Sequence, residues 1–173
     1  SPPTLVQLKR DGKVIDGVAL TTKSGHLYVF DRDTGAPMYP LVDVDALPST
    51  LPGEEPAPVQ TVSSVSFSRQ TFEITQRTPE ATKHVEALIK DWDLRPWAPP
   101  KVGTVLITPW YDGGAEWGGS AFDPANNRLI LNANNESGIL TLTEIPVGFS
   151  NAGAYATHCG SCHGANLEGT ETG

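Results

Sequence analysis

Short runs of β-branched, aliphatic and aromatic residues, separated by polar turn segments, occupy the start of the chain. Three such runs predict strands at Thr4–Leu8, Val14–Thr22 and His26–Asp31. The segments Arg10-Asp11-Gly12-Lys13 and Lys23-Ser24-Gly25 lie between them. Gly and Asp tolerate the backbone angles of tight hairpin turns, so these two segments predict that the strands pair as hairpins.

Residues 36–65 are rich in Pro, Ser and acidic side chains. A proline lacks the backbone N–H that a sheet ladder needs, so we expect an extended surface loop here. A disordered linker is the alternative. The prolines that carry this interpretation are Pro48, Pro52, Pro56 and Pro58.

One helix is predicted near residues 79–92. Thr78 can cap its first turn, and Pro79 suits the first helical position. A helical period then places Ala81, Val85, Leu88 and Trp92 on one face. Arg95-Pro96 marks the end of the helical pattern. We interpret the helix as a packing element on a β scaffold.

Strand patterns return in the second half of the chain, at Thr104–Thr108, Ser120–Phe122, Arg128–Asn132 and Ile139–Thr143. Two segments led by an aspartate, Asp31-Arg32-Asp33-Thr34-Gly35 and Asp123-Pro124-Ala125-Asn126-Asn127, predict turns. Their aspartates are interpreted as turn residues and not as a catalytic base. Many short strands with Gly and Pro between them are typical of an all-β sheet stack, barrel or propeller.

From about Asn151 the chain changes to small and polar residues, so we place a domain boundary near 148–152. The 173 residues carry a formal net charge of −8, and the few Lys and Arg are scattered. This argues against a nucleic-acid partner. No apolar run approaches the roughly 20 residues that span a bilayer. Because the chain begins at Ser1 without Met and stops soon after His163, we expect a piece of a longer protein.

The sharpest chemical signal is Cys159-Gly160-Ser161-Cys162-His163. Two thiols at this spacing add to the vinyl groups of a haem, and the adjacent His meets the iron; C-x-x-C-H is the attachment motif of haem c. A redox dithiol and a structural zinc site remain as alternatives, although only His158 offers a further zinc ligand nearby. The sixth iron ligand is expected beyond Gly173, because Met38 lies far upstream and is interpreted as a packing residue.

Four stretches of the chain resemble the pyrroloquinoline quinone (PQQ)-dependent dehydrogenases, in particular the membrane-type glucose and sugar/alcohol branch. They are Thr21-Thr22-Lys23-Ser24-Gly25-His26-Leu27-Tyr28-Val29-Phe30-Asp31-Arg32-Asp33-Thr34-Gly35-Ala36-Pro37; Leu51-Pro52-Gly53-Glu54-Glu55 with Pro58-Val59-Gln60; Glu116-Trp117-Gly118-Gly119-Ser120-Ala121-Phe122-Asp123-Pro124; and Leu129-Ile130-Leu131-Asn132-Ala133-Asn134. The resemblance implies an eight-bladed β-propeller, of which this chain would hold two to three blades. Tyr39 stands where the family's blade motif usually ends in Trp.

The resemblance also implies roles for individual residues. Lys23 matches the basic residue that reaches the quinone oxygens of PQQ, where a cation stabilises developing negative charge. Asn134, in preference to Asn132, matches an Asn whose amide points at PQQ. Trp117 is interpreted as part of the pocket wall or as a blade-packing residue. The catalytic Asp and the Ca²⁺ ligands of the family are expected before Ser1, so no catalytic base is expected in this chain.

We therefore expect residues 1–148 to be a partial PQQ-dehydrogenase propeller and 149–173 to be the truncated start of an α-helical cytochrome c domain. The whole protein is expected to be a periplasmic quinohaemoprotein, associated with the membrane through segments outside this chain. It would oxidise a sugar or alcohol and pass electrons through haem c to a quinone or cytochrome. The alternatives are a non-enzymatic c-type cytochrome fused to a structural β scaffold, and an interaction module with a zinc knuckle.

Overall fold

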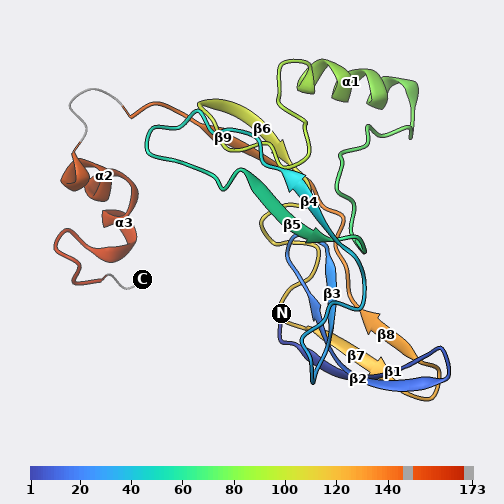
Figure 1. Ribbon diagram of the computed structural model, residues 1–173. Coiled ribbons are helices and arrows are strands. Elements are labelled where there is room, and N and C mark those ends of the chain that lie inside the picture. The colour runs from blue at the N-terminus through green and yellow to red at the C-terminus, as the bar shows by residue number, and fades with distance from the viewer. Residues whose placement is uncertain (146–149, 170–173) are drawn as a thin grey trace. The chain divides into compact units, whose positions relative to one another are not determined.

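The computed structural model describes residues 1–145 and 150–169. The chain divides into two compact units, Ser1–Leu142 and Thr143–Gly173, which are described separately. The predicted boundary between residues 148 and 149 lies outside the described residues. The first unit contains the strands and one helix, and the second contains two short helices (Figure 1).

The first sheet has the strand order β1-β2-β3, with β1 at Thr4–Arg10, β2 at Lys13–Thr21 and β3 at Leu27–Asp31. Both neighbouring pairs are antiparallel, and Arg10 pairs with Lys13 across a two-residue turn. Asp11 and Gly12 have φ of 51° and 74°, the positive values that a type I′ hairpin turn requires. The predicted strands and hairpins are confirmed here.

One face of this sheet carries the small apolar core of the unit. Val6, Ala19 and Val29 come from the three strands in turn, and each is no more than 5% exposed. Partly buried side chains pack against them from β1 and β3, from the segment after β3 and from two later strands: Leu8, Leu27, Met38, Phe122 and Leu129. Met38 is therefore a packing residue, as the sequence predicts.

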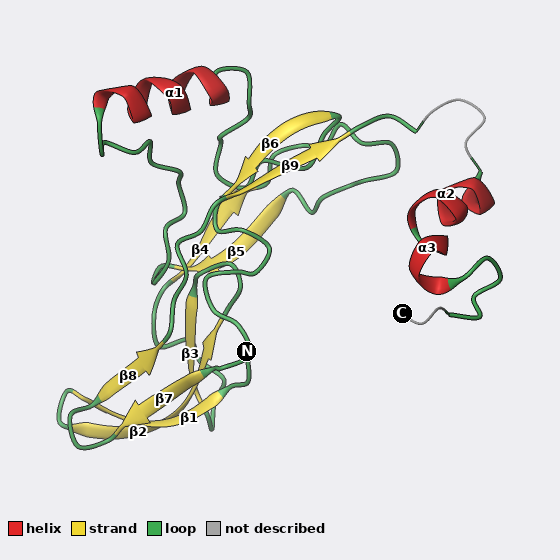
Figure 2. Cartoon of the chain, turned by 180° about the vertical axis from the view of Figure 1, so that it is seen from behind, coloured by secondary structure: helices red, strands yellow, loops and turns green. Residues whose placement is uncertain are grey.

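The strands β7 (Ser120–Asp123) and β8 (Arg128–Leu131) form an antiparallel hairpin that contacts β1. The Thr4 hydroxyl is 2.8 Å from the Ser120 hydroxyl. The amide side chain of Asn127 accepts from the backbone N–H of Lys9 at 2.9 Å and donates to its carbonyl at 3.2 Å. Short antiparallel sheets of this kind are consistent with the partial β-propeller that the sequence predicts (Figure 2).

The prediction of a loop throughout 36–65 is wrong, because this region contains two strands. β4 (Leu41–Asp45) pairs antiparallel with β5 (Val59–Ser63). Pro48, Pro52, Pro56 and Pro58 all lie in the connection between them, where no ladder hydrogen bond is needed. The prolines therefore confine the loop to the middle of the region, while the valines of β4 and β5 favour strands at its ends.

The helix α1 spans Pro79–Ile89, and the Thr78 hydroxyl accepts from the N–H of Ala81 at 3.1 Å, so the predicted cap is confirmed. The predicted apolar face is partly wrong. Leu88 is 49% exposed, whereas the adjacent Ile89 is 6% exposed. The helix ends at Ile89 and so cannot carry Trp92 on the same face. Its buried contact is thus made at its last turn.

The last sheet pairs β6 (Gly103–Ile107) with β9 (Gly138–Leu142). The segment before β6 is held by Asp93, whose side chain is only 8% exposed. Its carboxylate accepts from the guanidinium of Arg95 at 2.9 and 2.6 Å and lies 3.6 Å from the Lys101 amine. The hydrogen bonds from Arg95 hold the pKa of the Asp93 carboxyl well below its usual range.

The second unit contains α2 (Asn151–His158) and α3 (Gly160–His163). The Ser150 hydroxyl caps α2 by accepting from the N–H of Gly153 at 3.1 Å. The Tyr155 hydroxyl donates to the carbonyl of Gly164 at 2.6 Å, which ties the end of α3 back to α2. Within the described ranges no helix is long and apolar enough to cross a membrane.

Candidate functional site

Lys23 lies in the turn between β2 and β3, which side-chain and backbone hydrogen bonds hold in one conformation. The Thr22 hydroxyl donates to the carbonyl of His26 at 2.8 Å and accepts from its N–H at 3.2 Å. The N–H of Gly25 donates to the carbonyl of Thr22 at 3.0 Å, and Gly25 has a φ of +78°. These hydrogen bonds hold the backbone of Lys23 in one position. A fixed backbone suits a residue whose function depends on where its side chain is placed.

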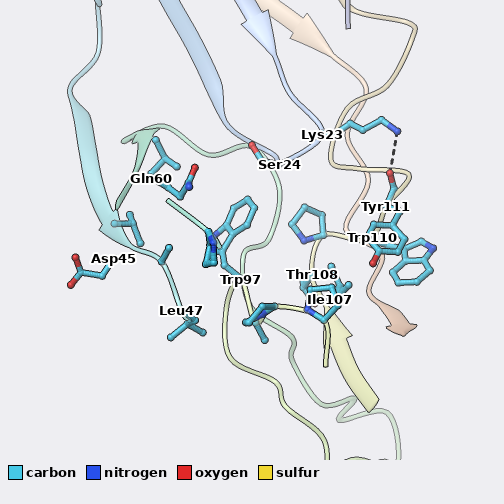
Figure 3. A pocket seen from close by; sticks show the side chains of 18 of the residues that line it. Lys23, Ser24, Asp45, Leu47, Gln60, Trp97, Ile107, Thr108, Trp110 and Tyr111 are labelled. Carbon is cyan, nitrogen blue, oxygen red and sulfur yellow. Dashed lines mark hydrogen bonds between the residues drawn. The ribbon is translucent and has the colours of Figure 1, made fainter. Parts of the chain in front are cut away.

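The amine of Lys23 has two acceptors from the segment that follows β6. It donates to the carbonyl of Tyr111 at 3.1 Å, and its nitrogen lies 2.7 Å from a carboxylate oxygen of Glu116. Figure 3 shows the amine reaching the Tyr111 carbonyl. The Lys23 side chain remains 61% exposed, so a ligand can reach the same amine.

Gly114 connects the backbone of Lys23 to that of Asn134. Its N–H donates to the Lys23 carbonyl at 2.7 Å, and its own carbonyl accepts from the Asn134 N–H at 2.9 Å. The Ser68 hydroxyl donates to the Asn134 carbonyl from another segment. Two residues that are distant in sequence are therefore brought to one loop, with Asn134 itself exposed.

Glycine is required where this loop meets the Lys23 turn. A Cβ on Gly113, whose φ is +86°, would lie 2.7 Å from the Cα of Lys23. A Cβ on Gly114 would lie 2.7 Å from the Cα of Gly25. Both distances are shorter than real Cβ contacts, so only glycine permits this backbone approach. Trp117 follows Glu116 in the same loop, with 90% of its surface exposed.

A cavity of about 620 Å³ lies beside the Lys23 turn within the first unit. Aromatic side chains line it, including Tyr28 from β3. Figure 3 shows three others, Trp97, Trp110 and Tyr111. Lys23 contributes a cationic group, and Asp45 and Glu54 contribute carboxylates. The segment Val44–Leu47, which includes the end of β4, and Gln60–Val62 of β5 complete this side of the cavity. A cavity of this size, with aromatic walls and polar groups of both charges, is typical of small-molecule and cofactor sites.

The aromatic walls are held by close packing. The rings of Trp110 and Tyr111 lie 4.5 Å apart, and a Cβ on Gly138 would overlap the Trp110 indole. Trp97 stacks on His26 at 6.1 Å between ring centroids. His26 is 6% exposed and lies three residues after Lys23, so one wall of the cavity is tied directly to the lysine turn.

Burial lowers the pKa of His26 below its ordinary value of 6.5, and a hydrogen bond with the Ser24 backbone opposes this only in part. The folded protein therefore prefers neutral His26, while the unfolded chain takes up a proton as the pH falls through about 6.5. We expect the free energy of unfolding to decrease as the pH is lowered from 7.5 to 5. His26→Phe keeps an aromatic ring against Trp97 but has no titrating group. In this variant the thermal unfolding midpoint, measured without added PQQ, should depend less steeply on pH. An unchanged slope in that variant would contradict the assignment.

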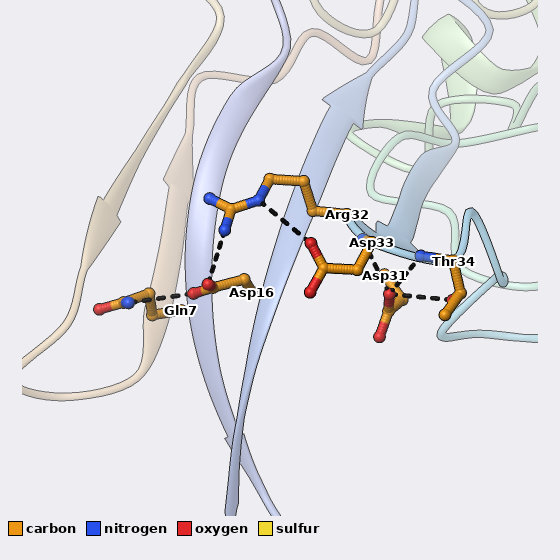
Figure 4. A network of polar contacts seen from close by, with 6 residues as sticks. All are labelled: Gln7, Asp16, Asp31, Arg32, Asp33 and Thr34. Carbon is orange, nitrogen blue, oxygen red and sulfur yellow. Dashed lines mark hydrogen bonds and ion pairs between the residues drawn. The ribbon is translucent and has the colours of Figure 1, made fainter.

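Asp31 and Asp123 are turn residues, as the sequence predicts. The Asp31 carboxylate accepts from the backbone N–H groups of Asp33 and Thr34 and from the Thr34 hydroxyl (Figure 4). The hydrogen bonds from Thr34 lower the pKa of Asp31. The side chain of Asn126 lowers the pKa of Asp123 in the same way. Carboxylates held ionised in turns are weak bases, so neither is a candidate for proton abstraction.

Figure 4 also shows a second polar network on the same sheet. Arg32 donates to Asp16 at 2.7 Å, and Asp16 accepts from Gln7 at 3.0 Å. The side chains of Arg32 and Asp16 are 47% and 33% exposed, so this ion pair has the same length and a similar exposure to that of Lys23 and Glu116. It provides a matched comparison for the pair at the candidate site.

In the second unit, one helical turn brings the two cysteines and the histidine of the C-x-x-C-H motif together. The N–H groups of Cys162 and His163 both donate to the Cys159 carbonyl, at 3.1 and 2.9 Å. Residues three and four apart in a helical turn share a face, so Cys159, Cys162 and His163 point to one side. Both cysteines are exposed. Exposed thiols beside an imidazole on one face fit the covalent attachment of a haem.

Within residues 1–145 and 150–169, no group of three His, Cys, Asp or Glu side chains lies together as a metal site. The residues that the sequence did not single out are Gly113, Gly114 and Trp110, together with Glu116 as a partner of Lys23. A double glycine after Trp110-Tyr111-Asp112 was the available signal, since paired glycines often mark a close backbone approach.

The chain matches the PQQ β-propeller domain of glucose/ethanol/alcohol dehydrogenases over residues 1–159. With the short antiparallel sheets of the first unit, this match shows that the chain belongs to the PQQ-dependent dehydrogenase β-propeller family. No solved structure matches the chain significantly.

Several curated proteins are similar to this chain. The glycerol dehydrogenase large subunit of Gluconobacter thailandicus is 28% identical over 132 residues, which are 72% of this chain and 18% of that protein. The quinoprotein glucose dehydrogenase of Gluconobacter oxydans (strain 621H) is 28% identical over 76% of this chain and 17% of its own length. The quinate/shikimate dehydrogenase (quinone) of Acinetobacter baylyi is 28% identical over 75% of this chain and 17% of its own length. The chain thus spans less than a fifth of these relatives.

Proposed function

We propose that this chain is part of a periplasmic, PQQ-dependent dehydrogenase that oxidises the CH–OH group of a sugar, polyol or other alcohol. We further propose that its second unit carries a covalently bound haem c, which passes electrons on to a quinone or cytochrome. The observation that carries the first part is the meeting of Lys23 and Asn134 at Gly114, beside an aromatic cavity. The relatives that are named for glycerol, glucose and quinate support the substrate class.

The residues present fit PQQ, which is a flat aromatic molecule with three carboxylates and an ortho-quinone. Flat aromatic walls from Trp97, Trp110 and Tyr111 match its ring system, and the Lys23 amine matches its anionic and quinone oxygens. Bound PQQ supplies the ortho-quinone that accepts the hydride from the substrate carbon.

Within this scheme Lys23 acts as an electrostatic stabiliser. Its ammonium has three N–H donors, and Tyr111 and Glu116 account for two among the described residues. The remaining donor can hydrogen-bond a quinone oxygen as negative charge develops there. Asn134 can orient the cofactor through its amide, which both donates and accepts. Trp117 is 90% exposed here and does not line the cavity, so its role as part of the pocket wall or as a blade-packing residue stays a prediction for the complete propeller. The general base and the Ca²⁺ ligands belong to residues outside this chain.

In the second unit Cys159 and Cys162 would form the two thioether bonds, and His163 would ligate the iron. The experiment that tests both parts uses the longer polypeptide that contains this chain, matured in a haem-attaching periplasm. Apoenzyme titrated with PQQ should gain saturable alcohol- or sugar-oxidising activity, and haem should stay with the polypeptide after extraction with acidified organic solvent.

The two parts fail separately in this experiment. Covalent haem with no PQQ-dependent activity would identify a non-enzymatic electron carrier. PQQ-dependent activity with fully extractable haem, or with zinc in place of iron, would remove the cytochrome c assignment.

A further inference from the structure

The pair formed by Lys23 and Glu116 joins two segments that the backbone already holds together. The backbone of Lys23 is fixed by the N–H of Gly114 and by the close approach of Gly113. The lysine side chain, however, has a flexible four-carbon stem and a mostly exposed surface, so these backbone contacts do not fix its amine. The Tyr111 carbonyl and the Glu116 carboxylate are the contacts that do.

Stability gives little reason for this ion pair. Its side chains are 61% and 29% exposed, and ion pairs at such exposure add little to the free energy of unfolding. A carboxylate beside the amine also weakens its attraction for an anionic cofactor. The ion pair adds little stability and opposes anion binding. Its presence is explained if its function is to orient the Lys23 amine for catalysis.

Resting on the proposed function, we propose that Glu116 is a positioning residue. Its carboxylate oxygen, with the Tyr111 carbonyl, orients the Lys23 ammonium so that the third N–H meets the quinone oxygen. Glu116 acts through Lys23 and does not itself touch the reacting atoms. Its own position is set by a turn in which the N–H of Gly119 donates to the Glu116 carbonyl at 3.2 Å.

The test compares Glu116→Ala, Glu116→Gln and Glu116→Asp in the full-length holoenzyme at saturating PQQ. Glu116→Ala should lower kcat about tenfold or more and leave KM for the substrate within about twofold. Glutamine keeps an acceptor oxygen at the same reach, whereas aspartate keeps the charge but is one methylene shorter. Positioning therefore predicts that Glu116→Gln recovers most of kcat and exceeds Glu116→Asp.

A double-mutant cycle with Lys23→Ala adds a readout that a structural role would not change. In the Lys23→Ala background, Glu116→Ala should cause no further loss of kcat and no further shift in the absorption spectrum of bound PQQ recorded without substrate, because the two residues act as one unit. Asp16→Ala, which breaks the matched ion pair with Arg32, should leave kcat unchanged.

Each other outcome overturns the proposal. Additive losses in the cycle, Glu116→Asp above Glu116→Gln, or wild-type kcat in Glu116→Ala would each show that Glu116 does not orient the amine. These results would not contradict the proposed function, provided that Lys23→Ala has a lower kcat than the wild type. Wild-type kcat in Lys23→Ala would instead overturn the role of Lys23 and, with it, that of Glu116.

Discussion

Lys23→Ala in the full-length protein is expected to raise the barrier to substrate oxidation by about 2–4 kcal/mol, the loss seen when a charge-stabilising donor is removed. The reason is that the alanine variant leaves the developing charge on the quinone without its cationic partner. The loss should appear in kcat at saturating PQQ, since binding of the flat cofactor also depends on the aromatic walls of the cavity. Steady-state kinetics with a titrated PQQ concentration measure this effect.

Two controls separate this effect from a general loss of structure. The haem content of Lys23→Ala should equal that of the wild type, because Lys23 and Cys159 lie in different units. Lys90→Ala removes a similarly exposed lysine just after α1 and should leave turnover unchanged. Wild-type turnover in Lys23→Ala at saturating PQQ would remove the cofactor assignment of Lys23.

The strands and turns that sequence reasoning found are those set by nearby residues. Asp11-Gly12 has one type of hairpin turn available to it, and the carboxylate of Asp31 finds its hydrogen-bond donors within three residues. Such local chemistry can be recognised without the rest of the fold. The helix cap at Thr78 is local in the same sense, and its prediction was also confirmed.

The features that were missed depend on partners distant in the chain. The strands β4 and β5 pair across a proline-rich connection, so neither alternation nor turn chemistry marked them. Leu88 was predicted on the packed face of α1, but Ile89 is the buried residue. The helical period alone does not show which surface α1 packs against. The residues of the candidate site show the same difference between local features and distant partners. Resemblance pointed to Lys23 and Asn134, whereas the loop that joins them, through Gly114 and Glu116, became visible only in three dimensions.

Gly113→Ala is the second change with a large expected effect. Gly113 has a φ of +86°, which costs an alanine about 1–2 kcal/mol. The new Cβ would also lie 2.7 Å from the Cα of Lys23, and relieving such an overlap costs about 1–3 kcal/mol. We expect the free energy of unfolding to fall by about 2–5 kcal/mol, measured by denaturant or thermal unfolding of the full-length protein.

Gly35→Ala isolates the two causes, because Gly35 has a φ of +73° but no atom lies within 4 Å of the position that its Cβ would take. It should therefore show only the backbone cost of about 1–2 kcal/mol and keep full activity. Gly113→Ala should in addition lower kcat, since the overlap is relieved by moving the Lys23 turn, and a displacement of about 1 Å at a reacting centre can cost about a hundredfold in rate. Equal destabilisation in the two variants, with full activity in both, would mean that the loop does not press on Lys23. Greater destabilisation and slower turnover in Gly113→Ala alone would tie the close backbone approach directly to the position of the amine.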